Sequence, residues 1–370
     1  MTWLLVLLML TVLSTGAEAA AHHAPAHKTF SAGTSSALAG ARVEAAAPNQ
    51  TNQKSTALIV KTEVLLDRAH FSPGEIDGQD GDNLHKAIRA FQQANNLPDT
   101  GNMDSETWSS LTEYSSQPIL KTYQVSASDA SGPFTKRIPD KLERLARLPG
   151  LSYASPAKEL SEKFHMSESL LRRLNPGVDI GRAGANITVA NVEPMRLRDG
   201  RTSVEAVPPA GRDVRKEDVA TIVVDKPARE LRAYDQSGKV LAVYPATIGS
   251  EEKPAPSGTF AVKRIVWNPD YHYDPKFAWK GVKTKRRLTV KAGPQNPVGL
   301  VWIDLTAPSY GIHGTAEPAN IGKTESHGCI RLTNWDALDL AAAVHRGTVV
   351  DFADQDSPVA PLSSSASTRR

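Results

Sequence analysis

Cysteine is almost missing from this chain, which holds one, Cys329, among 370 residues. A single thiol excludes an intramolecular disulfide framework. Aromatic residues are also few, at 6%, and 43 Lys and Arg nearly balance 40 Asp and Glu to leave a net charge of +3. The chain has no basic stripe and no aromatic RNA-binding motif, so nucleic acid is not an expected partner.

The usual marks of a bound cofactor or metal are missing as well. No glycine-rich phosphate-binding loop occurs, and no Cys and His residues have the spacing of a metal quartet. His22, His23 and His27 lie in a stretch rich in Ala, Ser and Thr, which is typical of a disordered tether rather than a metal site. The sequence therefore predicts no metal and no cofactor.

Long hydrophobic runs are absent apart from Trp3 to Leu13, which is too short to span a bilayer comfortably. Small residues follow at Ala17-Glu18-Ala19 and provide a cleavage site. We therefore predict a signal peptide over residues 1–19, export to the periplasm or cell wall, and no membrane span after cleavage. Because no Lys or Arg precedes the run, an uncleaved anchor is the alternative.

The single cysteine has reactive residue types around it. It lies in Ser326-His327-Gly328-Cys329-Ile330-Arg331-Leu332, sixteen residues after His313 of Gly311-Ile312-His313-Gly314-Thr315. An imidazole within reach of a thiol can take its proton and hold an ion pair near neutral pH. A small buried hydrophobe is the other interpretation of a lone cysteine. A glycine before the cysteine favours the nucleophile, because it lets successive N–H groups face an oxyanion.

These two motifs together resemble the active-site signature of the L,D-transpeptidase (YkuD-type) cell-wall enzymes. The resemblance extends to Trp267-Asn268-Pro269, Asn296-Pro297-Val298-Gly299 and Lys323-Thr324-Glu325, and it covers about residues 215 to 353. It implies that Cys329 is the nucleophile and that His313, not the nearer His327, is its general base. Residue types alone do not choose between the two histidines.

The same resemblance assigns the supporting residues. The carbonyl of Gly314 is expected to orient the imidazole, and the amides around Gly328 and Cys329 to form the oxyanion hole. Arg331 is expected to face a substrate carboxylate, with a structural ion pair as the alternative. For Ser326 and His327 the alternative to an active-site role is simply shaping the loop.

Alternating apolar residues predict a mostly-β sandwich or barrel-like catalytic domain over residues 214–354. Thr333, with Asp336 three residues on, predicts a capped helix that runs to about Val344. Residues 267–292 carry prolines, aromatics and a basic cluster, which indicate a loop or lid that is either solvated or holds acidic substrate groups. Strands are expected at 221–224, 231–234, 240–244, 258–265, 288–290, 300–305 and 349–352.

Two smaller units precede this domain. Residues 55–112 resemble a three-helix peptidoglycan-binding domain, with Leu84, Ala87, Ile88 and Phe91 on one helical face. Residues 139–192 resemble a small α+β LysM-like module, for which a degenerate module or helical spacer is the alternative. The connecting segments are a tether at 20–54, a linker at 193–213 and a disordered tail at 355–370.

The resemblance implies acyl transfer through a Cys329 thioester, which joins peptidoglycan stem peptides by 3→3 crosslinks. The expected partners are stem peptides and glycan strands, and a wall-anchored protein is a further candidate acceptor. Water as acceptor would make an L,D-carboxypeptidase, and a protein lysine would make an anchoring or cleaving enzyme. A non-catalytic wall-binding scaffold is the alternative from another class. The sequence does not indicate an oligomeric state.

Overall fold

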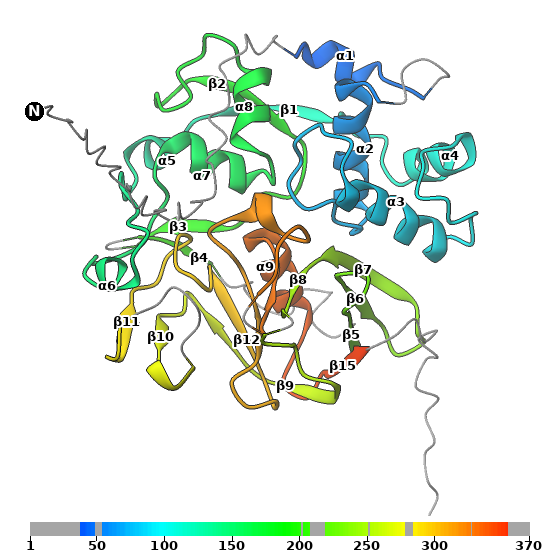
Figure 1. Ribbon diagram of the computed structural model, residues 1–370. Coiled ribbons are helices and arrows are strands. Elements are labelled where there is room, and N and C mark those ends of the chain that lie inside the picture. Colours follow the sequence, from blue (N-terminus) through cyan, green and yellow to red (C-terminus); the bar gives the residue numbers. More distant parts are fainter. Residues whose placement is uncertain are drawn as a thin grey trace, which may run out of the picture. The chain divides into compact units, whose positions relative to one another are not determined.

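The computed structural model describes residues 38–48, 54–200, 203–207, 219–250, 252–277, 284–326 and 328–353 (Figure 1). The predicted signal peptide at 1–19, most of the tether, part of the linker at 193–213, the tail at 355–370 and His327 lie outside these residues. Within the described part, no helix is both long and apolar enough to cross a bilayer.

The first described elements are helical: the three helices after residue 55 are those that the spacing of apolar residues predicts, whereas the first helix lies in the stretch 20–54 that was predicted to be a flexible tether. Polar side chains start two of these helices: Ser55 Oγ accepts from Leu58 N, and Asp104 accepts from Thr107 N at 2.8 Å. The helices are α1 (Gly40–Glu44), α2 (Thr56–Arg68), α3 (Asp82–Ala94) and α4 (Ser105–Glu113). The three-helix unit expected at 55–112 is therefore present as α2 to α4.

The next unit is a strand pair with helices between its strands. Strand β1 (Leu120–Gln124) runs antiparallel to β2 (Asn186–Ala190). Ser155 and Ser167 cap the two longer helices between them, with Pro156 in the first turn of the earlier one. Strand β1 lies before residue 139, the start that the sequence predicts for this unit. The intervening helices are α5 (Ala127–Ser131), α6 (Leu142–Leu145), α7 (Pro156–Lys163) and α8 (Glu168–Leu174).

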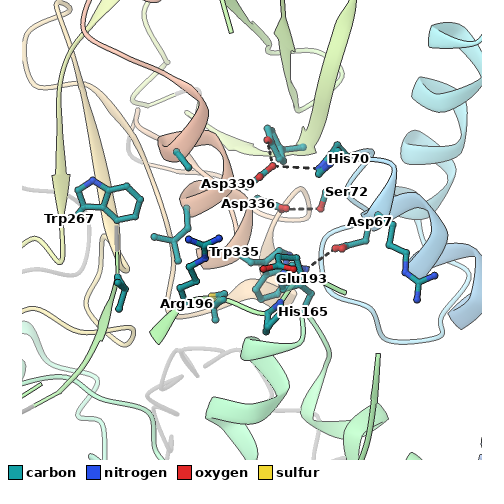
Figure 2. Close-up of a pocket in the computed structure, with 17 residues that line it drawn as sticks. Asp67, His70, Ser72, His165, Glu193, Arg196, Trp267, Trp335, Asp336 and Asp339 are labelled. Carbon is teal, nitrogen blue, oxygen red and sulfur yellow. Dashed lines mark hydrogen bonds and ion pairs between the residues drawn. The ribbon is translucent and has the colours of Figure 1, made fainter. Parts of the chain in front are cut away.

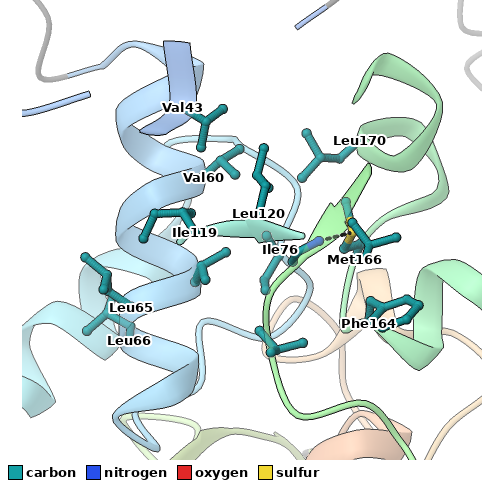
Figure 3. Packing of buried hydrophobic residues seen from close by; sticks show 14 of the residues in the cluster. Val43, Val60, Leu65, Leu66, Ile76, Ile119, Leu120, Phe164, Met166 and Leu170 are labelled. Atoms are coloured by element: carbon teal, nitrogen blue, oxygen red, sulfur yellow. Dashed lines mark hydrogen bonds between the residues drawn. The ribbon is translucent and has the colours of Figure 1, made fainter. Parts of the chain in front are cut away.

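One hydrophobic cluster joins these two units. Ile76 and Met166 form an isolated β-bridge, and the cluster runs from Val60 on α2 to Leu170 on α8 (Figure 3). It also takes in Val243 from the following domain. Because this one cluster contains buried side chains from both units, the helices and the strand pair share a core.

The catalytic domain is a mostly-β, barrel-like sheet, as predicted. Its strand order is β7-β6-β5-β15-β9-β12-β13-β14-β8 among the described residues, with β5 and β15 parallel and β13 and β14 parallel. The strands are β5 (Thr221–Asp225), β6 (Glu230–Tyr234), β7 (Val240–Pro245), β8 (Thr247–Ile248), β9 (Gly258–Trp267), β12 (Val301–Leu305), β13 (Gly311–His313), β14 (Ile330–Arg331) and β15 (Val349–Ala353).

Helix α9 (Asn334–Ala343) follows β14 directly and packs against β12 and β13. Its cap is the predicted one, since Thr333 Oγ1 accepts from Asp336 N at 3.1 Å. Part of the predicted lid is a hairpin in which β10 (Tyr271–Tyr273) pairs with β11 (Leu288–Val290). Shorter elements are β3 (Leu197–Asp199), β4 (Val204–Ala206) and the 3-10 turns η1 (Pro275–Phe277) and η2 (Pro318–Asn320).

Candidate active site

Two short parallel strands bring the two sequence motifs together. In the register of β13 and β14, Ile312 faces Ile330 and His313 faces Arg331. Leu332 N also donates to His313 O at 2.9 Å. Cys329 is the residue immediately before β14, and β14 pairs with β13, the strand that ends at His313. The pairing sets the segments that contain His313 and Cys329, sixteen residues apart in sequence, side by side, with Arg331 opposite His313.

His313 is buried and held in one orientation. Its side chain is stacked on Trp302, with 5.3 Å between ring centroids, and Nδ1 lies 2.7 Å from Gly314 O. A carbonyl oxygen only accepts, so Nδ1 carries the proton and Nε2 has the lone pair that a general base needs. Burial, helped by the nearby Arg331 charge, lowers the pKa of His313 to about 3. The imidazole is therefore neutral at physiological pH.

A buried asparagine supports the carbonyl that orients this histidine. Asn334 Oδ1 accepts from Leu300 N at 3.2 Å, and a side chain on Gly314 or Gly299 would overlap with the same oxygen. Asn334 Nδ2 donates to Glu162 Oε2 at 3.1 Å on α7. Asn334 thus links the segment at Gly314 to the preceding unit. Nothing in the sequence distinguishes this asparagine from any other helix-start residue.

The loop before the cysteine is shaped by Ser326. Its hydroxyl donates to Cys329 O at 2.6 Å and accepts from Gly328 N at 3.2 Å. Gly328 has φ of 107°, and a Cβ there would lie 2.9 Å from Tyr310 Cε1, so this position favours glycine. These contacts correspond to the loop-shaping alternative that the sequence left open for Ser326.

The surroundings of Cys329 favour a neutral thiol before reaction. Burial raises the pKa of Cys329, while the Gly311 N–H and the Arg331 charge oppose that rise. The Sγ also lies 3.9 Å from Ser309 O, and this carbonyl oxygen accepts a hydrogen bond from the thiol. Ser309 has φ of 69°, an uncommon conformation for this residue type. The resting pair is a thiol and a neutral imidazole, not the ion pair that residue types alone suggest.

Arg331 and Tyr271 are the ionisable side chains that interact electrostatically with the thiol. Burial lowers the pKa of Arg331, and negative charge on Cys329, Glu317 and Tyr271 opposes that change. Burial raises the pKa of Tyr271, and charge on Cys329 adds to the rise. The sequence placed Tyr271 only within the loop or lid predicted at residues 267–292. The charges of Cys329 and Arg331 act on Tyr271, which shows that it lies near the catalytic segment, a relation that local sequence does not carry.

Among the described residues, no group of three or more His, Cys, Asp or Glu side chains is placed to hold a metal ion. A cavity of about 410 Å³ has Tyr271, His272 and Trp302 in its wall. Trp302 also stacks on His313, so one wall residue of this cavity contacts the base, while His313 and Cys329 themselves do not line it.

Comparison with known proteins identifies this arrangement. A profile of the L,D-transpeptidase catalytic domain matches residues 220–352. YqjB of Bacillus subtilis, which is named as an L,D-transpeptidase, is 32% identical over 141 residues, covering 36% of this chain and 72% of that relative. The chain belongs to the L,D-transpeptidase family. A peptidoglycan binding domain profile matches residues 58–111 of this L,D-transpeptidase, so both predicted family resemblances are confirmed. The LysM-like character of 139–192 stays a prediction.

Two further relatives align with a larger part of this L,D-transpeptidase at lower sequence identity, and two solved structures align with about a third of it. YkuD of Bacillus licheniformis is 26% identical over 195 residues, covering 53% of this chain and 92% of the relative. YbiS of Escherichia coli is 28% identical over 209 residues, covering 54% and 60%. A solved L,D-transpeptidase 1 of Mycobacterium tuberculosis has 20% identity and a TM-score of 0.28, covering 36% and 62%. The solved catalytic domain from E. faecium has 22% identity and a TM-score of 0.29, covering 37% and 98%.

Proposed function

We propose that this protein is a peptidoglycan transpeptidase that forms 3→3 crosslinks through a Cys329 thioester. The observation that carries the proposal is the pairing of β13 with β14, which sets an oriented, neutral His313 on the strand beside the thiol. Family membership supplies the substrate class, and the site supplies a nucleophile and a base.

In the first half-reaction His313 Nε2 takes the thiol proton as Cys329 Sγ attacks the carbonyl between the third stem residue and the terminal D-alanine. A C–S bond forms, and backbone N–H groups at Gly328 and Cys329 stabilise the oxyanion. The C–N bond then breaks, and D-alanine leaves with the proton that His313 returns. The product is a thioester on Cys329.

In the second half-reaction the side-chain amine of another stem attacks the thioester carbonyl. His313 accepts the amine proton, the C–S bond breaks, and the proton returns to sulfur. Arg331 offers a positive charge for a substrate carboxylate, and the cavity beside Tyr271 and Trp302 offers space for a stem. A carbapenem, which presents a strained carbonyl, is expected to acylate the same thiol.

The acceptor decides between this activity and its alternatives in the same family. Water would give an L,D-carboxypeptidase, and a protein lysine would give an anchored protein. To test this, the enzyme is incubated with disaccharide-tetrapeptide and the products are separated by chromatography. A Cys329-dependent dimer supports transpeptidation, whereas tripeptide as the sole product would assign hydrolysis. Absence of any product with intact wall binding would favour a non-catalytic scaffold.

The domain arrangement supports an extracytoplasmic site of action, because the peptidoglycan binding profile and the catalytic profile lie in one chain. We propose periplasmic or cell-wall localisation after removal of residues 1–19. A fusion of residues 1–54 to a reporter enzyme that is active only outside the cytoplasm tests this. Reporter activity that disappears when residues 1–19 are removed is the expected result.

A further inference from the structure

A fully buried carboxylate from the unit before the catalytic domain contacts the start of α9. Glu162, on α7, is 0% exposed, and its Oε2 accepts from Asn334 Nδ2 at 3.1 Å. The mechanism proposed above does not use this acid. Burial of a carboxylate is costly unless charge and hydrogen bonds compensate it, so its place between two units calls for a physical reason.

Glu162 is compensated by an ion pair and by a phenol. Lys158 Nζ lies 3.0 Å from Glu162 Oε1, and Tyr153 Oη donates to Glu162 Oε2 at 3.4 Å. Burial alone would lower the pKa of Lys158, but the charge of Glu162 more than offsets this effect, so the pKa of Lys158 is raised. Glu75, on the loop after α2, interacts electrostatically with both side chains. Because the pair is ionised, Glu162 can only accept hydrogen bonds.

This acceptor fixes the orientation of the Asn334 amide. With Nδ2 held by Glu162, Oδ1 faces the catalytic sheet, where it accepts from Leu300 N at 3.2 Å. A Cβ added at Gly314 would overlap with this oxygen, so Oδ1 lies directly against that backbone. Nδ2 also lies 3.5 Å from Pro294 O, which is too far for a strong hydrogen bond. Glu162 is therefore the partner that keeps the amide in place.

From Gly314 the contacts continue to the imidazole. Gly314 O lies 2.7 Å from His313 Nδ1 and sets the tautomer in which Nε2 can take a proton. A displaced Gly314 carbonyl would change the orientation of this ring. Misplacement of a catalytic group slows the chemical step more than it weakens substrate binding.

A neighbouring contact holds the same helix without this connection. Asp336, two residues after Asn334, lines a cavity of about 480 Å³ and accepts from Ser72 Oγ at 3.0 Å (Figure 2). The three atoms that a Cβ at Gly314 would meet first all belong to Asn334. The Ser72 hydrogen bond thus ties α9 to the segment after α2, but it is not the contact made with Gly314.

We infer that Glu162 is a positioning residue for the general base and acts on it through Asn334. The inference rests on the proposed function, because it takes His313 as the base. Glu162 lies outside residues 220–352, which match the catalytic profile. Helix α7 then has a part in catalysis that is separate from any binding of the wall.

The test is single-turnover acylation of Cys329 in the full chain by disaccharide-tetrapeptide, followed by intact mass. We expect Glu162→Leu to lower the maximal acylation rate about tenfold, with less than about a twofold change in the half-saturating concentration. Glu162→Gln keeps an acceptor for Asn334 Nδ2 and should retain most of the rate. Ser72→Ala removes a buried hydrogen bond of similar length to the same helix, and its rate should match that of the parent.

Glu162→Leu also leaves Lys158 without its partner, which favours unfolding. The double variant Glu162→Leu with Lys158→Met removes both charges and still lacks the acceptor, so it should fold and be as slow as Glu162→Leu. Circular dichroism and thermal unfolding measure the folded fraction of each variant. Recovery of the parent's rate in the folded double variant would overturn the inference, because the loss would then come from the buried charge.

A second readout does not depend on substrate. The Nδ1–H of His313, bonded to Gly314 O, should give a slowly exchanging imidazole signal in NMR spectra, assigned by its absence from His313→Gln. We expect exchange of this proton to be about tenfold faster in Glu162→Leu and unchanged in Ser72→Ala.

An acylation rate that is unchanged in Glu162→Leu, or equally reduced in Ser72→Ala, would overturn the inference and leave the transpeptidase. If the parent itself is not acylated, the proposed function fails, and the imidazole signal alone decides on Glu162. Faster exchange in Glu162→Leu then supports positioning, and unchanged exchange overturns it.

Discussion

The protonation of two side chains decides how this enzyme starts its reaction. Burial lowers the pKa of His313 and raises that of Cys329, so both groups are neutral before substrate arrives. In the mechanism we propose, the thiolate then forms as the carbonyl is attacked, with His313 as the acceptor of the proton. Sequence motifs identify both residues, but burial of the pair is a property of the folded sheet.

The neutral pair predicts how fast Cys329 is alkylated. The rate with iodoacetamide should stay low from about pH 5 to pH 8 and rise only above the ordinary thiol pKa of 9.0, because the thiolate is the nucleophile and burial raises the pKa of Cys329 beyond that value. Since Cys329 is the only cysteine, the mass gained by the intact protein measures its alkylation directly, and Cys329→Ala is the negative control. A fast plateau already present near pH 5 would show a resting ion pair instead.

Asn334 should act as a positioning residue for the base. Asn334→Ala removes the oxygen that packs against Gly314 and accepts from Leu300 N, so we expect kcat to fall about tenfold to a hundredfold with little change in KM. Single-turnover acylation measures the loss, and thermal unfolding shows how much protein is folded. Glu162→Gln keeps an acceptor for Asn334 Nδ2 and should lose much less activity. Equal loss in both variants would argue against positioning by the asparagine oxygen.

Among the elements, the turn into β14 has a restricted position at Gly328. Gly328 has a positive φ and faces Tyr310, so Gly328→Ala should cost about 1–3 kcal/mol and misplace the oxyanion amides. Acylation by a carbapenem, followed by mass, should slow at least tenfold. Gly347→Ala is a useful comparison, because φ there is also positive at 96° but a Cβ meets open space far from the thiol in sequence. Similar acylation rates in both variants would contradict the account.

Helix α9 carries a carboxyl whose state sets a pH dependence of stability. Burial raises the pKa of Asp336 to about 8, from an ordinary value of 3.8. The folded state therefore binds more protons than the unfolded state between these values, and this group stabilises less as pH rises from about 4 to 8. The Asp336→Asn variant has no titrating group at this position, so its free energy of unfolding should fall less steeply between pH 4 and pH 8. Urea unfolding at pH 5 and pH 8 measures it, and an identical pH dependence in both proteins would refute the assignment.

Elements differ in how well local sequence predicts them. The cap at Thr333 and the alternating strands were predictable, because these signals lie within a few neighbouring residues. Strands β13 and β14 have three and two residues, too few for any period to appear. Their pairing creates the site, and it depends on contacts between segments far apart. For the same reason Tyr271, Trp302 and Asn334 were missed.

At the scale of the whole molecule, the two N-terminal units share one hydrophobic core. Phe91 on α3 belongs to the cluster that includes Leu170 on α8 and Val243 on β7. Phe91→Ala should destabilise by about 3–5 kcal/mol and lower the unfolding midpoint of both units together. Calorimetry measures the unfolding midpoint, and hydrogen exchange of the backbone amides in α2 and α8 reports the opening of each unit separately. Loss of protection confined to α2 would show that the units unfold independently.

This shared core also explains why deletion of residues 55–112 would test wall binding poorly. Removal of α2 to α4 would expose apolar residues of the following unit as well as abolish any binding surface.

The central claim is that Cys329 carries the acyl group, and intact-protein mass spectrometry tests it most directly. The mature enzyme is mixed with disaccharide-tetrapeptide, and Cys329→Ala is treated in the same way. The account predicts an adduct of the donor less its terminal D-alanine on the parent and none on the variant. An adduct that persists in Cys329→Ala, or turnover by that variant, would contradict it.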